Sequence, residues 1–143
     1  MSRLRPELTI ADFNARGASY LPGELGIEMT ALAQNTAASR MPVRQLHFAP
    51  NGFLHAASVV ALADTTCGYA TIAHLPAGAE SFTTIELKSN HLGTVHEGAI
   101  ACVAMAQHLG RNTQVWDAVV SDEASGRRIA LFRCTQMILW PKG

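Results

Sequence analysis

One stretch of eighteen residues, from Ala56 to Ala73, limits what this chain can fold into more than any other part of it. Nearly every position in the stretch is apolar, yet the charged residue Asp64 lies in its middle. A helix that is apolar on almost every side is a buried helix. This helix would be about 27 Å long, and its polar residues argue against a membrane span. We therefore predict that the rest of the chain wraps around it.

The sequence after this helix predicts an antiparallel sheet. Strand-like runs alternate with turn signals from residue 81 to residue 140, so the helix should lie against a sheet in a fold of the α+β class. In one of these runs, alternation puts Trp116 and Val120 on one face and Asp117 on the other. The expected strands are 82–90, 98–109, 113–121 and 128–139.

The sequence before the long helix predicts a short helix and a hairpin. Thr9 and Asp12 have the spacing of a capping box, which would open a helix from Ile10 to Arg16 that ends at Gly17. A loop is expected at 21–23. Strands 25–32 and 36–43 would form a hairpin and bring the sheet to about six strands, although the alanines of this segment also suit a helix.

Composition bounds the size and the partners of the protein. The 143 residues suffice for one domain, 1–143, with its own core. The formal net charge is zero, which gives no basic field for nucleic acid. Charged residues make up only 15% of the chain. This low share favours burial of further surface against a second copy of the chain.

The cysteines and histidines indicate the compartment and argue against a metal. Cys67, Cys102 and Cys134 are an odd number of thiols inside apolar runs and lack C-x-x-C spacing. We therefore expect reduced cysteines in a cytoplasmic protein, and neither disulfides nor a zinc site. The six histidines show no metal-ligand spacing. The N-terminal residues have no apolar run of signal-peptide length.

Several motifs together resemble a known family. A turn Asn-Gly-x-x-His ends at His55, and Leu-Ala-Asp follows, with Asp64 nine residues after that histidine. Downstream come Thr-x-Glu-Leu from Thr84 and His-Leu-Gly-Arg ending at Arg111. Over residues 52–137 the chain resembles the hotdog-fold acyl-CoA thioesterases of the phenylacetate-degradation type. The resemblance implies a hotdog fold, with a long central helix wrapped by an antiparallel sheet, and hydrolysis of an acyl thioester without a metal or redox cofactor.

The resemblance also implies roles for individual residues. Asp64 would be the general base or the nucleophile, and the backbone N–H of Ala56 would polarise the thioester carbonyl. His55 would have a direct or a structural role in the turn, and Thr84 would help to orient water. Arg111, with Arg127 and Arg128, would bind the phosphates of coenzyme A.

The chain departs from the family pattern at the turn. It has His55-Ala56-Ala57 where the family has His-Gly-Gly, and Ala49 where many relatives have an amide. Alanine keeps the backbone N–H, but it would be strained if the first position required a positive φ.

The distance along the helix predicts a shared site. Asp64 lies eight residues beyond Ala56, which is about 12 Å along one helix. One carboxylate therefore cannot easily reach a carbonyl held at the N-terminus of its own helix. Two antiparallel helices related by a two-fold axis would bring Asp64 of one subunit to Ala56 of the other. We expect a homodimer, and possible pairing of dimers into a homotetramer.

Other interpretations of the same residues remain open. Asp64 could cap a second helical segment that begins at Thr65, and Cys67 could be a buried core residue or a nucleophile. The protein could be a non-catalytic acyl-CoA-binding dimer. A hotdog hydratase would carry an acidic residue where this chain has Pro50. The acyl group, and the choice between coenzyme A and an acyl carrier protein as its carrier, are left undetermined.

Overall fold

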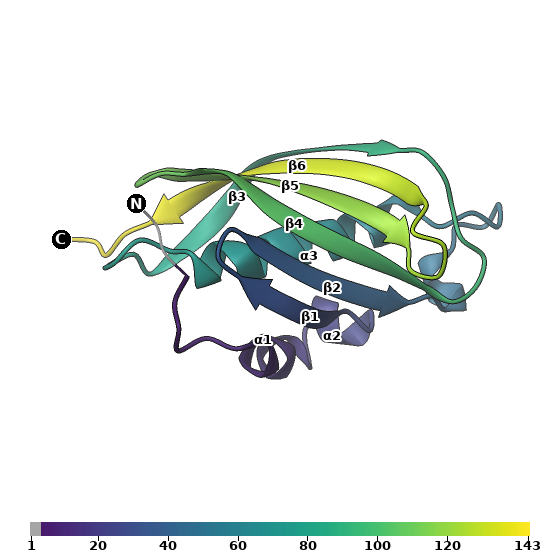
Figure 1. The fold of residues 1–143 in the computed structure, drawn as a ribbon, viewed down its shortest axis with the longest axis horizontal. Coiled ribbons are helices and arrows are strands. Elements are labelled where there is room, and N and C mark those ends of the chain that lie inside the picture. Colours follow the sequence, from purple (N-terminus) through teal and green to yellow (C-terminus); the bar gives the residue numbers. More distant parts are fainter. Residues whose placement is uncertain (1–3) are drawn as a thin grey trace.

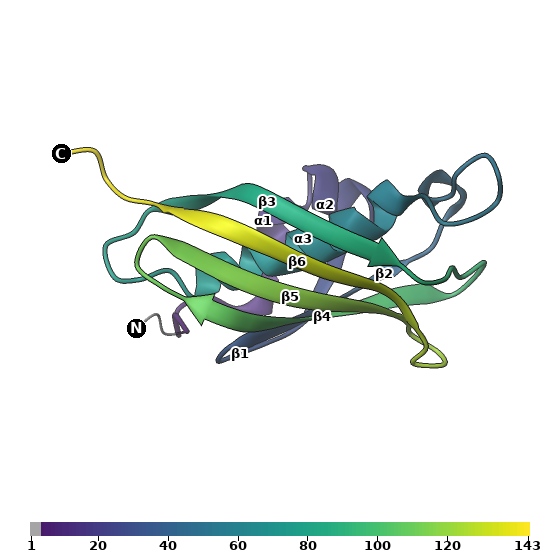
Figure 2. The same cartoon turned by 90° about the horizontal axis from the view of Figure 1, so that it is seen from above.

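The long helix α3 (Ala56–Ala73) lies along one face of a six-stranded antiparallel sheet. The structure is a computed structural model and describes residues 4–143. Figure 1 shows the sheet curving over α3, and Figure 2 shows the helix running beneath the strands. The helix is unbroken through Asp64. The interpretation of Asp64 as the cap of a second helix is therefore wrong.

The strands follow one another in the order β1-β2-β4-β5-β6-β3. Each of the four strands predicted after the helix is present within about one residue of its expected ends, and the alternation within β5 is as predicted, with Trp116 and Val120 buried against the helix side. The strand bounds are β1 (Glu28–Ala33), β2 (Thr36–Pro42), β3 (Ser81–His91), β4 (Ala99–Leu109), β5 (Thr113–Asp122) and β6 (Arg128–Leu139).

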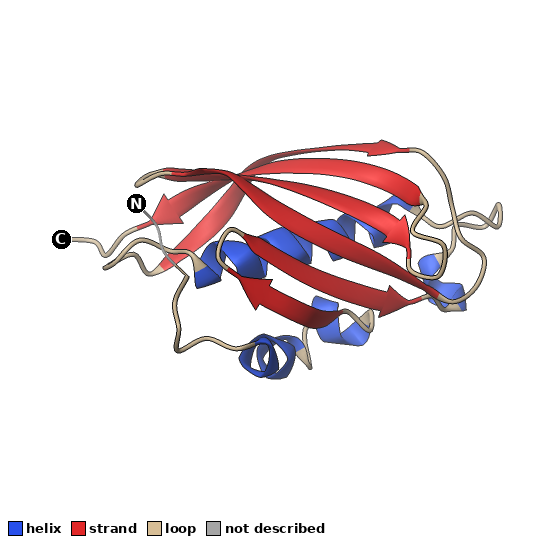
Figure 3. Ribbon diagram, viewed as in Figure 1, coloured by secondary structure: helices blue, strands red, loops and turns tan. Residues whose placement is uncertain are grey.

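The N-terminal segment agrees with the prediction except at one loop and at the start of the first strand, which was expected at residue 25 and begins at Glu28. Helix α1 (Ile10–Gly17) begins with the expected Thr9–Asp12 capping box and includes Gly17 as its last residue. The loop predicted at 21–23 is wrong, because these residues form one turn of helix, α2 (Leu21–Glu24), with a proline in its first turn. Proline is favourable there because the first N–H groups of a helix have no intrahelical acceptor. Figure 3 shows the helices gathered on one side of the sheet.

The two edges of the sheet differ in what covers them. At the β1 edge, the Asn14 side chain of α1 accepts from the Met29 N–H (2.8 Å) and donates to the Met29 carbonyl (3.2 Å). At the β3 edge nothing comparable lies within residues 4–143, and Ile85 and Leu87 are 52% and 43% exposed. A long uncovered edge with apolar side chains can pair with another strand.

The far end of α3 is fixed by buried polar side chains. Gln114 donates to the His74 carbonyl (2.9 Å) and accepts from the Trp116 indole N–H (2.9 Å). His74 itself packs against the Trp116 ring, with the ring centroids 5.2 Å apart. Although α3 has the length and apolar composition of a membrane span, this packing makes it the core helix of the fold.

Candidate active site

The first turn of α3 is capped by His55. Its Nδ1 accepts a hydrogen bond from the Ala57 N–H (2.9 Å), and its carbonyl accepts from the Ser58 N–H (3.0 Å). Because Nδ1 is an acceptor, the neutral ring carries its hydrogen on Nε2. Among the described residues the Ala56 N–H has no acceptor. One amide at the positive end of a buried helix is thus left free to donate.

Alanine fits the first helical position without strain. The only non-glycine residue with a positive φ in residues 4–143 is Asn35, so Ala56 has an ordinary helical backbone. The departure from His-Gly-Gly to His55-Ala56-Ala57 therefore keeps the free N–H and costs no backbone energy of this kind.

The turn before the helix is built on His47, which the sequence analysis did not single out. His47 ends a short 3₁₀ helix (Gln45–His47) and is fully buried. Its Nδ1 accepts from the Arg44 N–H (2.9 Å), and Nε2 donates to the Leu25 carbonyl (2.8 Å). Its own carbonyl accepts from the His55 N–H (2.9 Å) and the Ser58 hydroxyl (2.8 Å). His47 thereby fixes where α3 begins, a role that becomes visible only when the distant partners are in place.

Asp64 is an anomaly inside the helix. Its Oδ1 atom is buried and has no hydrogen-bond partner among the described residues. Burial raises the pKa of this carboxyl group above its ordinary value, because a low-dielectric environment disfavours the charged form. A raised pKa makes the carboxylate a better base. An unpaired buried carboxylate is costly for stability and typical of a functional position.

Thr84 lies at the same level as Asp64. The helix and β3 touch at Gly68, where an added Cβ would lie 3.1 Å from the Phe82 ring. From this contact, Asp64 is about 6 Å back along α3, and Thr84 is about 7 Å forward along β3. The two elements run in opposite directions, because the other end of β3 lies beside the start of α3. The half-buried Thr84 is therefore close to the part of the helix that carries Asp64.

A cleft of about 260 Å³ opens beside the start of α3. Its walls are mainly apolar, and Ala56, the residue with the free amide, is part of one of them. On the other side the cleft is bounded by the end of β3 and the loop after it. The residues that line it include Phe53, Leu54, Ala56, Val59, His91 and Thr94.

Comparisons with known proteins agree with this geometry. The sequence model described as the thioesterase superfamily matches residues 51–129. The chain belongs to the thioesterase superfamily. This range includes the cleft, the whole of α3 and the strands β3 to β5.

Individual relatives of this thioesterase-superfamily chain are similar over almost their whole length. The proofreading thioesterase EntH of Cronobacter turicensis is 31% identical over 135 residues, which cover 92% of this chain and 95% of that protein. The crystal structure of a mutant thioesterase from Pseudomonas aeruginosa superposes with a TM-score of 0.89 at 29% identity, covering 95% of this chain and 97% of that one. A thioesterase from Haemophilus influenzae gives 0.88 at 28% identity, with 95% and 94% covered. The hotdog fold is confirmed, and the chain is an enzyme of the thioester hydrolase class.

The arginines expected to bind phosphate lie far apart in this thioesterase. Arg111 is in the β4–β5 turn, with its guanidinium 4.1 Å from the centre of the Trp140 ring. Arg128 begins β6, beside Ser121 at the opposite end of the sheet. The position on β6 beside the Arg111 turn is Met137, nine residues from Arg128. Nine residues of a strand span about 30 Å. Within one subunit, Arg111 and Arg128 are therefore too far apart to contact one phosphate group together, and their role in binding coenzyme A stays a prediction.

The cysteines are unsuited to nucleophilic chemistry. All three are buried and free. A hydrogen bond with Cys134, together with burial, raises the pKa of the Cys67 thiol well above its usual value. Burial raises the pKa of Cys102 to about 12. Protonated, inaccessible thiols are core residues.

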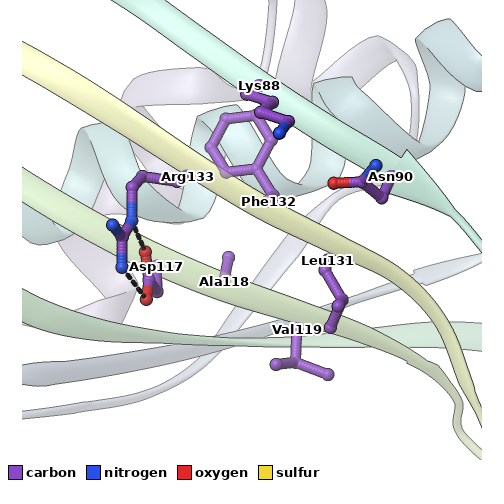
Figure 4. Close-up of a pocket in the computed structure, with 8 residues that line it drawn as sticks. All are labelled: Lys88, Asn90, Asp117, Ala118, Val119, Leu131, Phe132 and Arg133. Atoms are coloured by element: carbon purple, nitrogen blue, oxygen red, sulfur yellow. Dashed lines mark hydrogen bonds and ion pairs between the residues drawn. The ribbon is translucent and has the colours of Figure 1, made fainter.

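A second hollow lies on the opposite face of the sheet. Figure 4 shows this pocket of about 330 Å³, with α3 behind the strands and an ion pair between Asp117 and Arg133 at one side. It is also lined by Lys88, Asn90 and Leu131. None of the residues predicted to form the active site is part of it.

Proposed function

We propose that this enzyme is an acyl-CoA thioesterase of the phenylacetate-degradation type that works as a homodimer with two shared sites. The observation that supports this proposal most strongly is the half-buried carboxylate of Asp64, with one buried oxygen that has no partner among the described residues, on the same helix as the free amide of Ala56. The two groups are about 12 Å apart along an unbroken helix. A single site within one subunit cannot use both on one carbonyl.

The uncovered β3 edge is where we place the two-fold axis. Antiparallel pairing of β3 with its copy would bring the Asp64 region of one helix toward the start of the other. The same two-fold rotation places the two sheets end for end. The end of the sheet that carries Arg111 in one subunit then lies beside the end that carries Arg128 in the other. The two arginines would then reach the phosphates of one coenzyme A molecule from different subunits.

In this mechanism the thioester carbonyl accepts from the Ala56 N–H of one subunit. Asp64 of the other subunit acts on the carbonyl carbon, either as a base that takes a proton from water or as a nucleophile that forms an anhydride. Thr84, at the same level along the helix as Asp64, would orient the water. His55 acts through its cap on the first turn, which keeps the Ala56 amide in place.

The carrier, the assembly and the compartment are parts of the same proposal. We favour coenzyme A over an acyl carrier protein because two arginines are available for its phosphates. The dimer is the smallest assembly that completes an active site. A tetramer made of two such dimers would contain the same sites and no additional kind of site. The buried free cysteines fit a cytoplasmic enzyme.

The test is release of free thiol from a panel of aryl-, short-chain and medium-chain acyl-CoA substrates by the wild type and by Asp64→Asn. We expect turnover of at least one substrate by the wild type and a loss of turnover in the variant, with binding of the substrate retained. Equal turnover by the two proteins would contradict the role of Asp64. The same acyl groups on a carrier protein, measured in parallel, identify the carrier.

A further inference from the structure

The cleft beside Ala56 is lined by His91, which the mechanism above does not use and which is hydrogen-bonded to Ser89. Ser89 and His91 lie two residues apart on β3, so both face the helix side of the sheet. The Ser89 hydroxyl is 3.0 Å from Nε2 of His91. His91 lines the cleft, and it is the one titratable residue among those that do. An imidazole thus lines the same small cleft as Ala56, the residue that carries the free amide.

The backbone of the turn supplies fewer donors than an oxyanion needs. Tetrahedral intermediates of acyl transfer are typically held by two or more preorganised donors. The Ala57 N–H is already bonded to His55, and the Ser58 N–H is bonded to the His55 carbonyl. The Ala56 N–H is the single free amide in this turn among the described residues.

The other polar side chain of the cleft is occupied. The Thr94 hydroxyl accepts from the Leu54 N–H (2.9 Å) and donates to the Val95 carbonyl (3.4 Å). These bonds tie the loop after β3 to the turn before α3. His91 is therefore the side chain in the cleft that can supply the second donor.

We propose that the His91 imidazole is the second hydrogen-bond donor to the thioester oxygen, acting through Nδ1. Since Nε2 is held by Ser89, Nδ1 is the ring nitrogen left for the ligand. If the Ser89 hydroxyl donates to Nε2, the neutral ring carries its hydrogen on Nδ1. Ser89 is then a positioning residue that fixes the tautomer. This inference rests on the proposed function, and it assigns His91 to the same subunit as the Ala56 amide.

Three substitutions at His91, with one at the neighbouring Asn90 as control, separate this role from packing. The side-chain nitrogen of asparagine can take the place of histidine Nδ1, whereas that of glutamine lies nearer to Nε2. We expect His91→Ala and His91→Gln to lower kcat about 100-fold with little change in KM, and His91→Asn to restore most of the loss. Asn90→Ala is the matched control, because Asn90 is the next residue of β3 and lines the pocket on the opposite face (Figure 4).

The ring tautomer gives a readout independent of turnover. Long-range ¹H–¹⁵N NMR of the wild type at pH 8 should show His91 as the Nδ1–H form, and Ser89→Ala should shift the ring toward a mixture of tautomers. An Nε2–H ring in the wild type would overturn the proposal. So would an Asn variant as impaired as the Ala variant.

The kinetic outcomes also separate this inference from the proposed function. Full activity of His91→Ala, with none in Asp64→Asn, would overturn the role of His91 and leave the thioesterase mechanism standing. Absence of turnover by the wild type on every thioester would overturn both.

Discussion

At the scale of single residues, the most informative group is one that weakens the fold. Asp64 has a buried oxygen without a partner, and burial raises the pKa of its carboxyl group. A group whose pKa is raised on folding is easier to bury when protonated. Its charge therefore costs stability as the pH rises through the folded-state pKa. Such a cost is expected where a carboxylate is kept for chemistry.

We predict that Asp64→Asn is more stable than the wild type at pH 7. Removal of the buried charge should raise the free energy of unfolding by about 1 kcal/mol, or a few degrees in Tm. The gain should shrink as the pH falls through the raised folded-state pKa, because the wild-type carboxyl group then becomes protonated too. Thermal melts followed by circular dichroism at several pH values measure this. Glu80→Gln, which removes a charge from an exposed residue, is the control, and a variant less stable than the wild type at pH 7 would contradict the prediction.

At the scale of elements, α3 presents its two functional groups at different levels. Its N-terminus is defined by a cap whose parts come from several segments, because His55 is itself held by the buried His47. Its middle carries Asp64, level with Thr84 on β3. In the proposed dimer the helix is a rigid spacer, and its length places the two groups in different sites.

The amide of Ala56 can be removed without disturbing the helix. Ala56 is the first helical residue, a position that proline favours, and His55 has the extended backbone (φ −65°, ψ 133°) that a residue before proline adopts. We predict that Ala56→Pro lowers kcat about 100-fold and changes the free energy of unfolding by less than about 1 kcal/mol. Kinetics and melting curves test this. Ala56→Gly, which keeps the N–H, should remain active, and an active proline variant would exclude the amide from the mechanism.

At the scale of the whole molecule, the uncovered β3 edge and the split site point to the same assembly. The β1 edge is covered by Asn14 of α1, whereas the β3 edge presents Ile85 and Leu87 to solvent. Pairing of two β3 edges would bury these side chains and complete both sites. A sheet edge that is needed for function does not have to be protected within one chain.

We predict that two inactive variants complement each other in a mixed dimer. A heterodimer of Asp64→Asn with Ala56→Pro would contain one site with both groups intact and one site with neither. A heterodimer purified with two affinity tags should therefore have about half of the wild-type activity per dimer. Each homodimer should be inactive. A mixed dimer no more active than either homodimer would show that both residues serve one subunit's site.

The sequence by itself determined the long helix, the strands that follow it and the unusual position of Asp64 inside the helix. The apolar run of α3 and the alternation of β3 to β6 follow from local periodicity, so their bounds were predicted within about one residue. Asp64 stood out because a charge inside an apolar helix is costly anywhere. The helix α2 was missed because proline and glycine in sequence are typical of turns, whereas contacts with neighbouring segments decide whether one helical turn forms.

Only the tertiary structure decided how distant residues combine. It showed that His47 holds the start of α3, that Ala57 is capped while Ala56 is free, and that His91, bonded to Ser89, lines the same cleft as Ala56. It also separated Arg111 from Arg128 by the length of the sheet. Hydrogen bonds of this kind join residues far apart in the chain. Their geometry depends on the packing of the sheet against α3, which local sequence patterns do not encode.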